Sequence, residues 1–385
     1  MAANTLTGLI PTIYESLDIV SRELVGFIPA VSRNSSAERA AKDQTIRIPI
    51  APASSATSIS PANVSPDTGE QTISYTDITI SKAYQVPVKW NGEEQKSLAS
   101  GQPQNIMRDQ FTQAMRVLVN TIEADLASLY VSASRAYGTS GSTPFATSLS
   151  DAAQIKKILD DNGAPDDGQR SLVIGTAAQV NMLGLSNLVA NYAAGTDATL
   201  RQGIIPPIFN MNVRASAQVK THTKGTATGY DCTAVEPVGE TTIACDGSDS
   251  GTILAGDVVT NTTKADGILY VVNSGSTLTG NASGNFIINA PGLLAATASD
   301  NEWTTQSSYT ANMAFHKSAI QLVTRAPFMP SVGDAADDVI EVTDPISGLA
   351  FQVAMYKQYR QVHYEVGIAW GYAAIKPSHI CLLLG

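Results

Sequence analysis

The strongest pattern of apolar positions along the chain lies between residues 103 and 137. Apolar side chains recur there at steps of three to five residues, close to the period of an α-helix. The stripe consists of Ile106, Phe111, Met115, Leu118, Ile122, Leu126, Leu129 and Ala133. Gly101 and Pro103 punctuate its start, and Gly138 its end. A helix over 103–137 would be on the order of 45 Å long, and its stripe must pack on a sheet or on other helices.

A different pattern fills residues 45–92, where apolar and polar positions alternate. Ile46, Ile48 and Ile50 form the first run, and later runs surround residues 78–80 and 86–90. A period of two predicts strands with one covered face, and the prolines within the runs favour sheet edges. Between the runs, residues 52–70 are almost all Pro, Ser, Ala and Thr. This composition predicts a loop that projects from the body and finds its cover on a neighbour.

The first 44 residues are typical of an arm. Ile13, Leu17, Val20 and Leu24 recur every three or four residues, which predicts an amphipathic helix, and residues 32–43 are small and polar. Glu15 and Asp18 lie on or near the polar face of that helix.

Residues 148–200 alternate between helical and strand patterns. We predict a helix over 151–161 capped by Ser150, a buried strand over 172–174 and a small helix over 176–185. Dense apolar patterning returns over 311–385, with strands predicted at 319–323, 351–359 and 366–374. The fold class is therefore α+β.

Composition changes sharply between residues 221 and 310. The segment is rich in Gly, Thr, Ser and Asn, and turn dipeptides separate short β-branched runs. It holds two basic residues, Lys224 and Lys264, against nine acidic ones, so it carries −7 of the chain's net charge of −10. We interpret it as an inserted, solvent-facing β module with the form of a small barrel or sandwich.

Overall composition narrows the function. Charged residues make up 15% of the chain, against about 25% in ordinary soluble domains, so much of the surface is expected to meet partners. The net charge of −10 argues against specific nucleic-acid binding. No apolar run approaches the roughly 20 residues that span a bilayer, and the first residues lack a signal-peptide pattern. We therefore expect no membrane association and synthesis in a cytoplasm. In that reducing compartment Cys232 and Cys245 could pair, although free thiols are favoured.

No catalytic or cofactor motif is present, including phosphate-binding loops, nucleophile elbows and zinc-protease patterns. The four histidines lie in no metal-ligand spacing, and the acidic pairs at 160–161, 166–167 and 337–338 lie in turn contexts that favour solvated loops. We predict a protein that is not an enzyme, with no catalytic, cofactor-binding or metal-binding residues and no cofactor.

Several stretches together resemble the coat proteins of short-tailed phages that carry an inserted β domain, a family with the Hong Kong 97-type capsid fold. The stretches are the C-terminal run 368–377 (Ile-Ala-Trp-Gly-Tyr-Ala-Ala-Ile-Lys-Pro), Ala255–Val259, Ile287–Pro291, the junction Lys224–Gly229 and the run Ala319–Pro327. The first looks like the family's closing strand, and the next two like parts of its inserted domain.

The resemblance implies an N-arm at 1–44 and an extended β loop at 45–92. A peripheral domain at 93–200 would carry the spine helix 103–137 and the start of an axial domain. The axial domain would continue at 201–220, an inserted β domain would occupy 221–310, and residues 311–385 would return to the axial and peripheral domains.

The implied function is that of a major capsid protein, which self-assembles into an icosahedral shell around the double-stranded DNA of a tailed phage. The subunit would form pentamers and hexamers, work with scaffolding and portal proteins, be made in the bacterial cytoplasm and reside in the virion. Glu15 and Asp18 would be candidate contacts to a basic scaffolding helix, although an ordinary solvated helix face explains them as well. A β-rich phage tail or surface-adhesion protein is the alternative function, and an enzyme on a β scaffold is the third.

Overall fold

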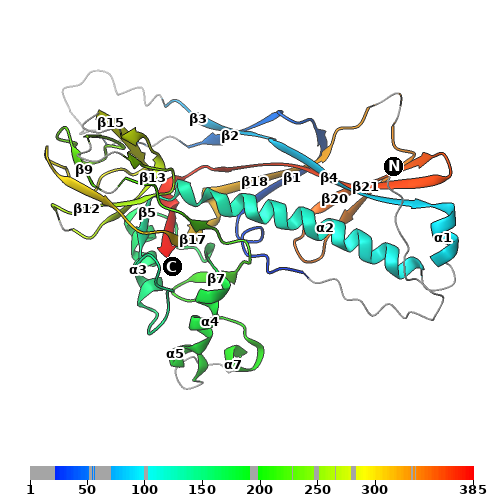
Figure 1. Cartoon of the computed structure of the whole chain (residues 1–385), viewed down its shortest axis with the longest axis horizontal. Helices are drawn as coiled ribbons and strands as arrows, with labels where there is room; N and C mark the ends of the chain where they lie inside the picture. The colour runs from blue at the N-terminus through cyan, green and yellow to red at the C-terminus, as the bar shows by residue number, and fades with distance from the viewer. Residues whose placement is uncertain are drawn as a thin grey trace, which may run out of the picture.

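The computed structural model describes residues 22–51, 54, 56, 71–98, 103–190, 198–227, 229–246, 251–264, 266–278, 283–330, 333 and 335–385. Within these residues the fold is mixed α/β and consists mostly of strands. The molecule is elongated, with a long helix running along a sheet at one end and a second, larger sheet at the other (Figure 1). None of the described helices is long and apolar enough to cross a membrane.

The long helix α2 (Pro103–Ala127) packs against the first sheet. Leu118, Ile122 and Leu126 of its apolar stripe are fully buried. The sheet has the order β1-β18-β21-β20-β19, and β4 pairs with β21. Its strands are β1 (Ser32–Ala40), β4 (Lys82–Asn91), β18 (Ile320–Pro327), β19 (Asp338–Thr343), β20 (Ala350–Gln358) and β21 (Gln361–Ala374). Strand β1 lies parallel to β18, so the polar segment after residue 31 forms a strand that the sequence did not predict.

The predicted end of the long helix is wrong. The α-helix ends at Ala127, a 3-10 turn follows over Ser128–Ser132, and Arg135–Tyr137 forms strand β5. Strand β5 pairs with β13 (Leu269–Ser274) on one side and with β22 (Ile380–Leu384) on the other. These two pairings satisfy backbone groups that a longer helix would have used, and Ala133 reaches the core outside any helix.

The second sheet joins the body to the 221–310 segment. Its order is β12-β16-β9-β10-β15-β13-β5-β22-β17-β6-β7, and β8 pairs with β17. The strands not yet bounded are β6 (Arg170–Ile174), β7 (Met211–Ala215), β8 (Thr221–His222), β9 (Gly229–Cys232), β10 (Thr242–Asp246), β12 (Val258–Asn261), β15 (Ser283–Ile288), β16 (Glu302–Thr305) and β17 (Tyr309–His316). The short strands β11 (Gly251–Thr252) and β14 (Thr277–Leu278) pair with each other. The 221–310 segment is thus hydrogen-bonded to the body through β13 and β5.

That segment nevertheless has a hydrophobic core of its own. The core comprises Ala227, Tyr230, Cys232, Ile243, Cys245, Ile253, Val259, Tyr270, Val272, Phe286, Ile288, Leu293 and Trp303. The sequence missed β9 and β16, and the structure describes Cys232 and Cys245 as free thiols on neighbouring strands.

Among the described residues, four helices lie around the body end of the second sheet. They are α3 (Ser150–Asp161), α4 (Thr176–Gly184), α5 (Ser186–Val189) and α7 (Ala198–Gln202). The expected cap is one residue out of place, because Ser150 lies inside α3 and the capping position is Leu149, which has no capping side chain. A separate short helix, α1 (Gly92–Leu98), follows β4 at the far end of the molecule.

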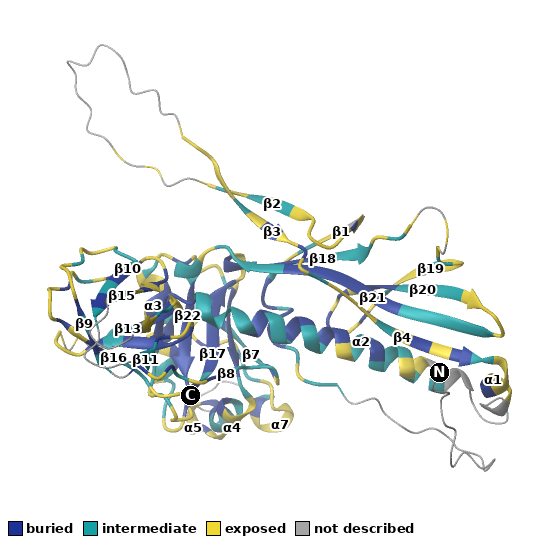
Figure 2. Cartoon of the chain, turned by 45° about the horizontal axis from the view of Figure 1, so that its top comes forward, coloured by how far each residue is buried: buried dark blue, intermediate teal, exposed yellow. Residues whose placement is uncertain are grey.

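The alternating runs predicted around residues 46–50 and 78–80 form a two-stranded hairpin that stands away from the body (Figure 2), whereas the run at 86–90 lies in β4 of the first sheet. Strands β2 (Thr45–Ile50) and β3 (Ser74–Thr79) pair from Thr45 opposite Thr79 to Ile50 opposite Ser74. Only the root is covered: Ile78 and Ile80 are buried, and a Cβ at Gly371 of β21 would lie 2.3 Å from the Thr79 carbonyl oxygen. Most of the predicted loop 52–70 lies outside the described residues.

Candidate functional site: buried anchors and exposed interaction surfaces

The two residues proposed from the sequence as scaffold contacts, Glu15 and Asp18, lie outside the described residues. The first described residue is Arg22. From there the N-terminal segment is held to the body by buried polar contacts, which no sequence motif predicted.

The main anchor of the arm is the carboxylate of Glu123, which lies in α2 and is fully buried. Its oxygens accept hydrogen bonds from three consecutive backbone N–H groups, those of Gly26 (2.6 Å), Phe27 (2.7 Å) and Ile28 (3.0 Å). The hydroxyl of Ser216, just after β7, donates a fourth at 2.8 Å. One buried charge is therefore satisfied by two segments that are distant in sequence, which joins the arm, the long helix and the second sheet.

The chain path at this anchor depends on glycine. A Cβ at Gly26 would lie 2.8 Å from the Ala215 carbonyl oxygen and 2.9 Å from a methyl group of Val173. Phe27 and Ile28 beside it are fully buried in the main core. A larger residue at position 26 would push the arm away from Glu123.

Two ion pairs flank the anchor. The guanidinium of Arg116 and the side-chain amide of Asn120, both in α2, donate to the carboxylate of Glu23. The hydrogen bond from Arg116 lowers the pKa of Glu23 to about 2. Arg22 forms a two-pronged pair with Asp344 after β19, with both N–O distances at 2.8 Å. Burial raises the pKa of Asp344, but the hydrogen bonds from Arg22 and Ser347 outweigh it, so the net shift is downward.

The hairpin has almost no comparable attachment beyond its root. On one face, Arg47 pairs with Asp77 across the strands at 2.9 Å and lies over the ring of Tyr75 at 3.6 Å. The other face carries Ile46, Ile48 and Ile50, which are all half-buried, and Ile46 is the one of the three that packs against a core cluster of the described residues. A two-stranded hairpin is marginal in water by itself, so the outer part of this one has little support from the described body.

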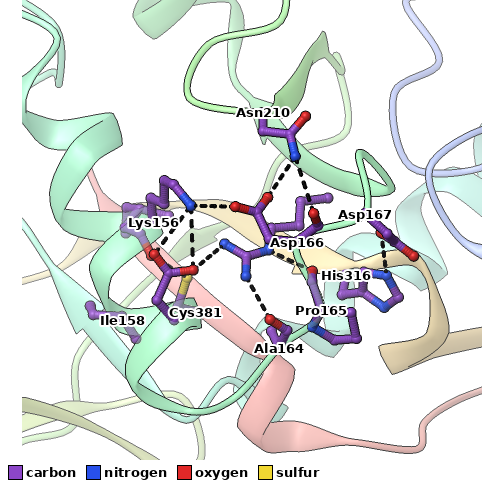
Figure 3. Close-up of polar contacts among 12 residues, drawn as sticks. Lys156, Ile158, Ala164, Pro165, Asp166, Asp167, Asn210, His316 and Cys381 are labelled. Carbon is purple, nitrogen blue, oxygen red and sulfur yellow. Dashed lines mark hydrogen bonds and ion pairs between the residues drawn. The ribbon is translucent and has the colours of Figure 1, made fainter.

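The acidic pairs noted in the sequence at 160–161 and 166–167 lie in a polar network beside α3 (Figure 3). Lys156 contacts Asp160 at 3.1 Å and Asp166 at 2.8 Å. Burial raises the pKa of Asp160, but hydrogen bonds from Arg170 and Lys156 outweigh it and the net shift is downward. These carboxylates are occupied by cations of the chain itself, so they form a structural network and do not converge on a ligand.

The neighbouring Asp167 accepts from its own loop and from a histidine. The backbone N–H of Gln169 donates at 3.0 Å and lowers the pKa of Asp167, helped by His316 Nε2 at 3.1 Å. Figure 3 shows Asp167 and His316 facing each other at the edge of the network. The third acidic pair is also engaged locally, because Asp337 accepts from the Lys357 backbone N–H at 2.6 Å.

A second buried polar cluster joins the 221–310 segment to the body. His222 Nε2 contacts Asp257 at 2.8 Å, and the Tyr130 hydroxyl contacts His222 Nδ1 at 2.8 Å. Asp257 also accepts from the backbone of Gly225 and Leu254. An Asp–His–Tyr chain resembles a proton relay, but here His222 and Asp257 are buried, at 4% and 1% exposed, and Tyr130 is half-buried, so the cluster serves as a structural joint. Across the described ranges, no three His, Cys, Asp or Glu side chains are grouped so as to hold a metal ion.

Exposed apolar side chains gather in two places. Where α4, α5 and α7 project from the second sheet (Figure 1), Val180, Leu200, Ile204 and Phe209 are 68%, 67%, 55% and 44% exposed. At the end of the molecule that carries α1, Tyr359 is 90% exposed in the turn between β20 and β21. That turn and α1 border an open groove of about 950 Å³. These surfaces are candidates for contact with other chains.

Comparisons with known proteins gave solved structures only: no family model and no curated protein matches the sequence. The chain is similar to a chain of a solved structure from Mycobacterium phage Che8, with 13% identity, 98% of each chain covered and a TM-score of 0.48. It is similar to the capsid of the cyanophage P-SCSP1u, with 11% identity, 98% of this chain and 92% of that chain covered and a TM-score of 0.49. For the capsid of a native GTA particle the identity is 10%, the coverage 100% and 99%, and the TM-score 0.47.

Proposed function

We propose that this chain is the major capsid protein of a tailed bacteriophage and that it self-assembles into an icosahedral shell around double-stranded DNA. The observation that carries the proposal is the β2–β3 hairpin, which stands away from the body (Figure 2), and in which Ile48 and Ile50 are only half-buried and join no core cluster of the described residues. A repeated subunit explains this economically, because each copy can supply the cover that its neighbour lacks.

The finer architecture belongs to the same proposal. In a Hong Kong 97-type fold, residues 1–44 would be the N-arm, 45–92 the extended loop, and α2 with the first sheet the peripheral domain. The second sheet with α3 to α7 would be the axial domain, and 221–310 the inserted domain. The exposed apolar tip around Leu200 and Phe209 would then lie near the capsomer axis, where copies in pentamers and hexamers meet.

The proposal also includes partners outside the shell. They are a scaffolding protein and a portal protein, with Glu15 and Asp18 as the proposed scaffold contacts. The acidic balance suits an inner wall that tolerates packaged phosphate without gripping it. The proposal includes synthesis in the bacterial cytoplasm, residence in the virion and no enzymatic activity.

A tail fibre or adhesin with a trimeric helical stalk is the alternative. A stalk needs an apolar seam left free for partner helices. In α2 the central stripe residues Leu118, Ile122 and Leu126 are fully buried against the chain's own core, which favours the shell.

Negative-stain electron microscopy of the expressed chain, alone and with a co-expressed scaffolding protein, tests the proposal. We expect closed shells or ring-shaped capsomers. Trimeric fibres, or monomers that persist at high concentration with the scaffold present, would overturn it.

A further inference from the structure

The inner face of the 221–310 segment carries two thiols on neighbouring strands. Cys232 in β9 and Cys245 in β10 are directly opposed partners in an antiparallel pair. Directly opposed residues project to the same face of a sheet, and both side chains are buried, at 1% and 0% exposed. The third cysteine, Cys381 of β22, belongs to a different core cluster.

The hydrogen-bond pattern sets the separation of the two cysteines. The next opposed pair along the strands, Thr233 and Ala244, is joined by a backbone hydrogen bond of 3.1 Å. Because bonded and non-bonded pairs alternate along an antiparallel ladder, Cys232 and Cys245 form a non-hydrogen-bonded pair, with Cα atoms typically about 4.5 Å apart. That separation lies within the range of about 4.4–6.8 Å that disulfides span.

Both side chains are free thiols in this structure, and each Sγ atom forms a hydrogen bond. Cys245 Sγ donates to the Gly284 carbonyl oxygen at 3.3 Å, and Cys232 Sγ accepts from the Trp303 indole N–H at 2.9 Å. Burial raises the pKa of Cys245 to about 12 and also raises that of Cys232. Strands β12, β16, β9, β10, β15 and β13 form a barrel that the β12–β13 pairing closes. The thiolate is the reactive form, so the pair reacts slowly while this barrel is closed and faster whenever it opens locally.

We propose that Cys232 and Cys245 are a latent disulfide that closes across β9 and β10 when the chain meets a small-molecule disulfide such as glutathione disulfide. The thiolate of one cysteine attacks the oxidant, giving a mixed disulfide and one glutathione. The second cysteine attacks the protein sulfur of that mixed disulfide and releases the other glutathione. Two thiols are oxidised to one disulfide, one disulfide is reduced to two thiols, and the two protons end on glutathione.

The link would tie together the ends of the connection between β9 and β10, residues 233–244. It would lock the barrel after the chain leaves a reducing cytoplasm, without any change of fold, because the two strands are already paired. The reaction depends on the barrel geometry alone and does not require the capsid role.

Mass spectrometry of the folded full chain after exposure to glutathione disulfide tests the inference. Both cysteines lie between Lys224 and Lys264, in one tryptic peptide. We expect that peptide to become lighter by about 2 Da and to regain the mass on reduction. Alkylation after denaturation should then find one free thiol, that of Cys381. Below about pH 8 the rate should rise nearly tenfold per pH unit, following the thiolate fraction of the opened state.

Two variants control the assignment. Cys381→Ser should leave the mass change intact, whereas Cys245→Ser should abolish it and allow at most one glutathione on Cys232. The inference is overturned if the folded wild-type peptide keeps its mass over a period in which the backbone amides of β9 and β10 exchange fully with solvent, because the strands have then opened in the presence of the oxidant. Glutathione adducts without the internal link, or a link to Cys381, would overturn it as well.

Discussion

The segment 26–28 and the β2–β3 hairpin are both backbone stretches near the start of the chain, yet they are held in opposite ways. Residues 26–28 donate three N–H groups to the buried carboxylate of Glu123, and Phe27 and Ile28 are fully buried. The hairpin is buried only at Ile78 and Ile80, while Tyr75 is 54% exposed and Ile73, just before β3, is 67% exposed. The first segment is completed within the chain and should govern folding. The hairpin is incomplete and should govern association.

The largest expected effect follows from shortening the hairpin's connection. Deleting residues 54–68 should leave a folded, soluble subunit, because this polar, proline-containing stretch has too few apolar side chains to form a core. Stable shells should fail to form, which microscopy and sedimentation would show. Normal shells from the deletion variant would mean that the hairpin is not needed for association.

The opposite effect is expected at the arm. Glu123→Gln replaces one acceptor oxygen by an N–H₂ group that faces backbone donors, so it should lower the free energy of unfolding by about 3 kcal/mol. Urea denaturation of the subunit measures this. Glu93→Gln, at an exposed position of α1, is the matched control and should change stability by less than about 0.5 kcal/mol. If the two variants were equally stable, Glu123 would not be the residue that anchors residues 26–28.

Point changes on the two faces of the hairpin sharpen the contrast. Ile48→Asp places a charge on the half-buried apolar face, whereas Thr45→Asp places the same charge on the exposed face that carries Arg47. We expect both subunits to unfold within about 0.5 kcal/mol of the wild type. The concentration needed for assembly should rise at least about tenfold for Ile48→Asp only, because a partner would bury that charge. Light scattering against concentration distinguishes the two faces.

Acid should loosen the arm by a smaller amount. The pKa of Glu23 is lowered from 4.5 to about 2 by Arg116, so its contribution is complete above 4.5 and is lost as the pH falls towards 2. Part of the side chain is exposed, so we expect about 1 kcal/mol after solvent screening. The stability difference between wild type and Glu23→Gln should therefore be present at about pH 7 and vanish near pH 2. A difference that persists in acid would contradict this origin.

The smallest effect is expected beyond the described residues. Reversing Glu15 and Asp18 together to Lys should reduce co-purification of a basic scaffolding protein with the shells, while leaving subunit stability unchanged. Unchanged scaffold content would return both residues to an ordinary solvated helix face.

Local patterns in the sequence predicted the elements whose signal is local. The alternation of apolar and polar residues predicted β2 and the strands around residues 78 and 86. The apolar stripe at helical spacing predicted α2 up to Leu126. The composition break marked the segment that carries its own core. The end of α2 could not be predicted, because it is set by the pairing of β5 with β13 and β22, which lie more than 100 residues away in the chain.

Sequence reasoning also missed functional features of two kinds. Strands β9 and β16 are short and rich in polar residues, although the alternation of Tyr230 with Cys232 was a usable signal. No sequence signal indicated that Glu123 is buried, because its partners are mostly backbone N–H groups of a segment about 95 residues earlier. A buried carboxylate looks the same in sequence as a solvated one.

Hydrogen exchange in the subunit and in the assembled form tests the central claim most directly. The account predicts that the amides of residues 26–28 are protected in both forms. It predicts that the amides of β2 and β3 beyond the root exchange freely in the isolated subunit and become protected on assembly. Hairpin amides already protected in the subunit, or still unprotected in the assembled form, would contradict the claim that another copy completes the hairpin.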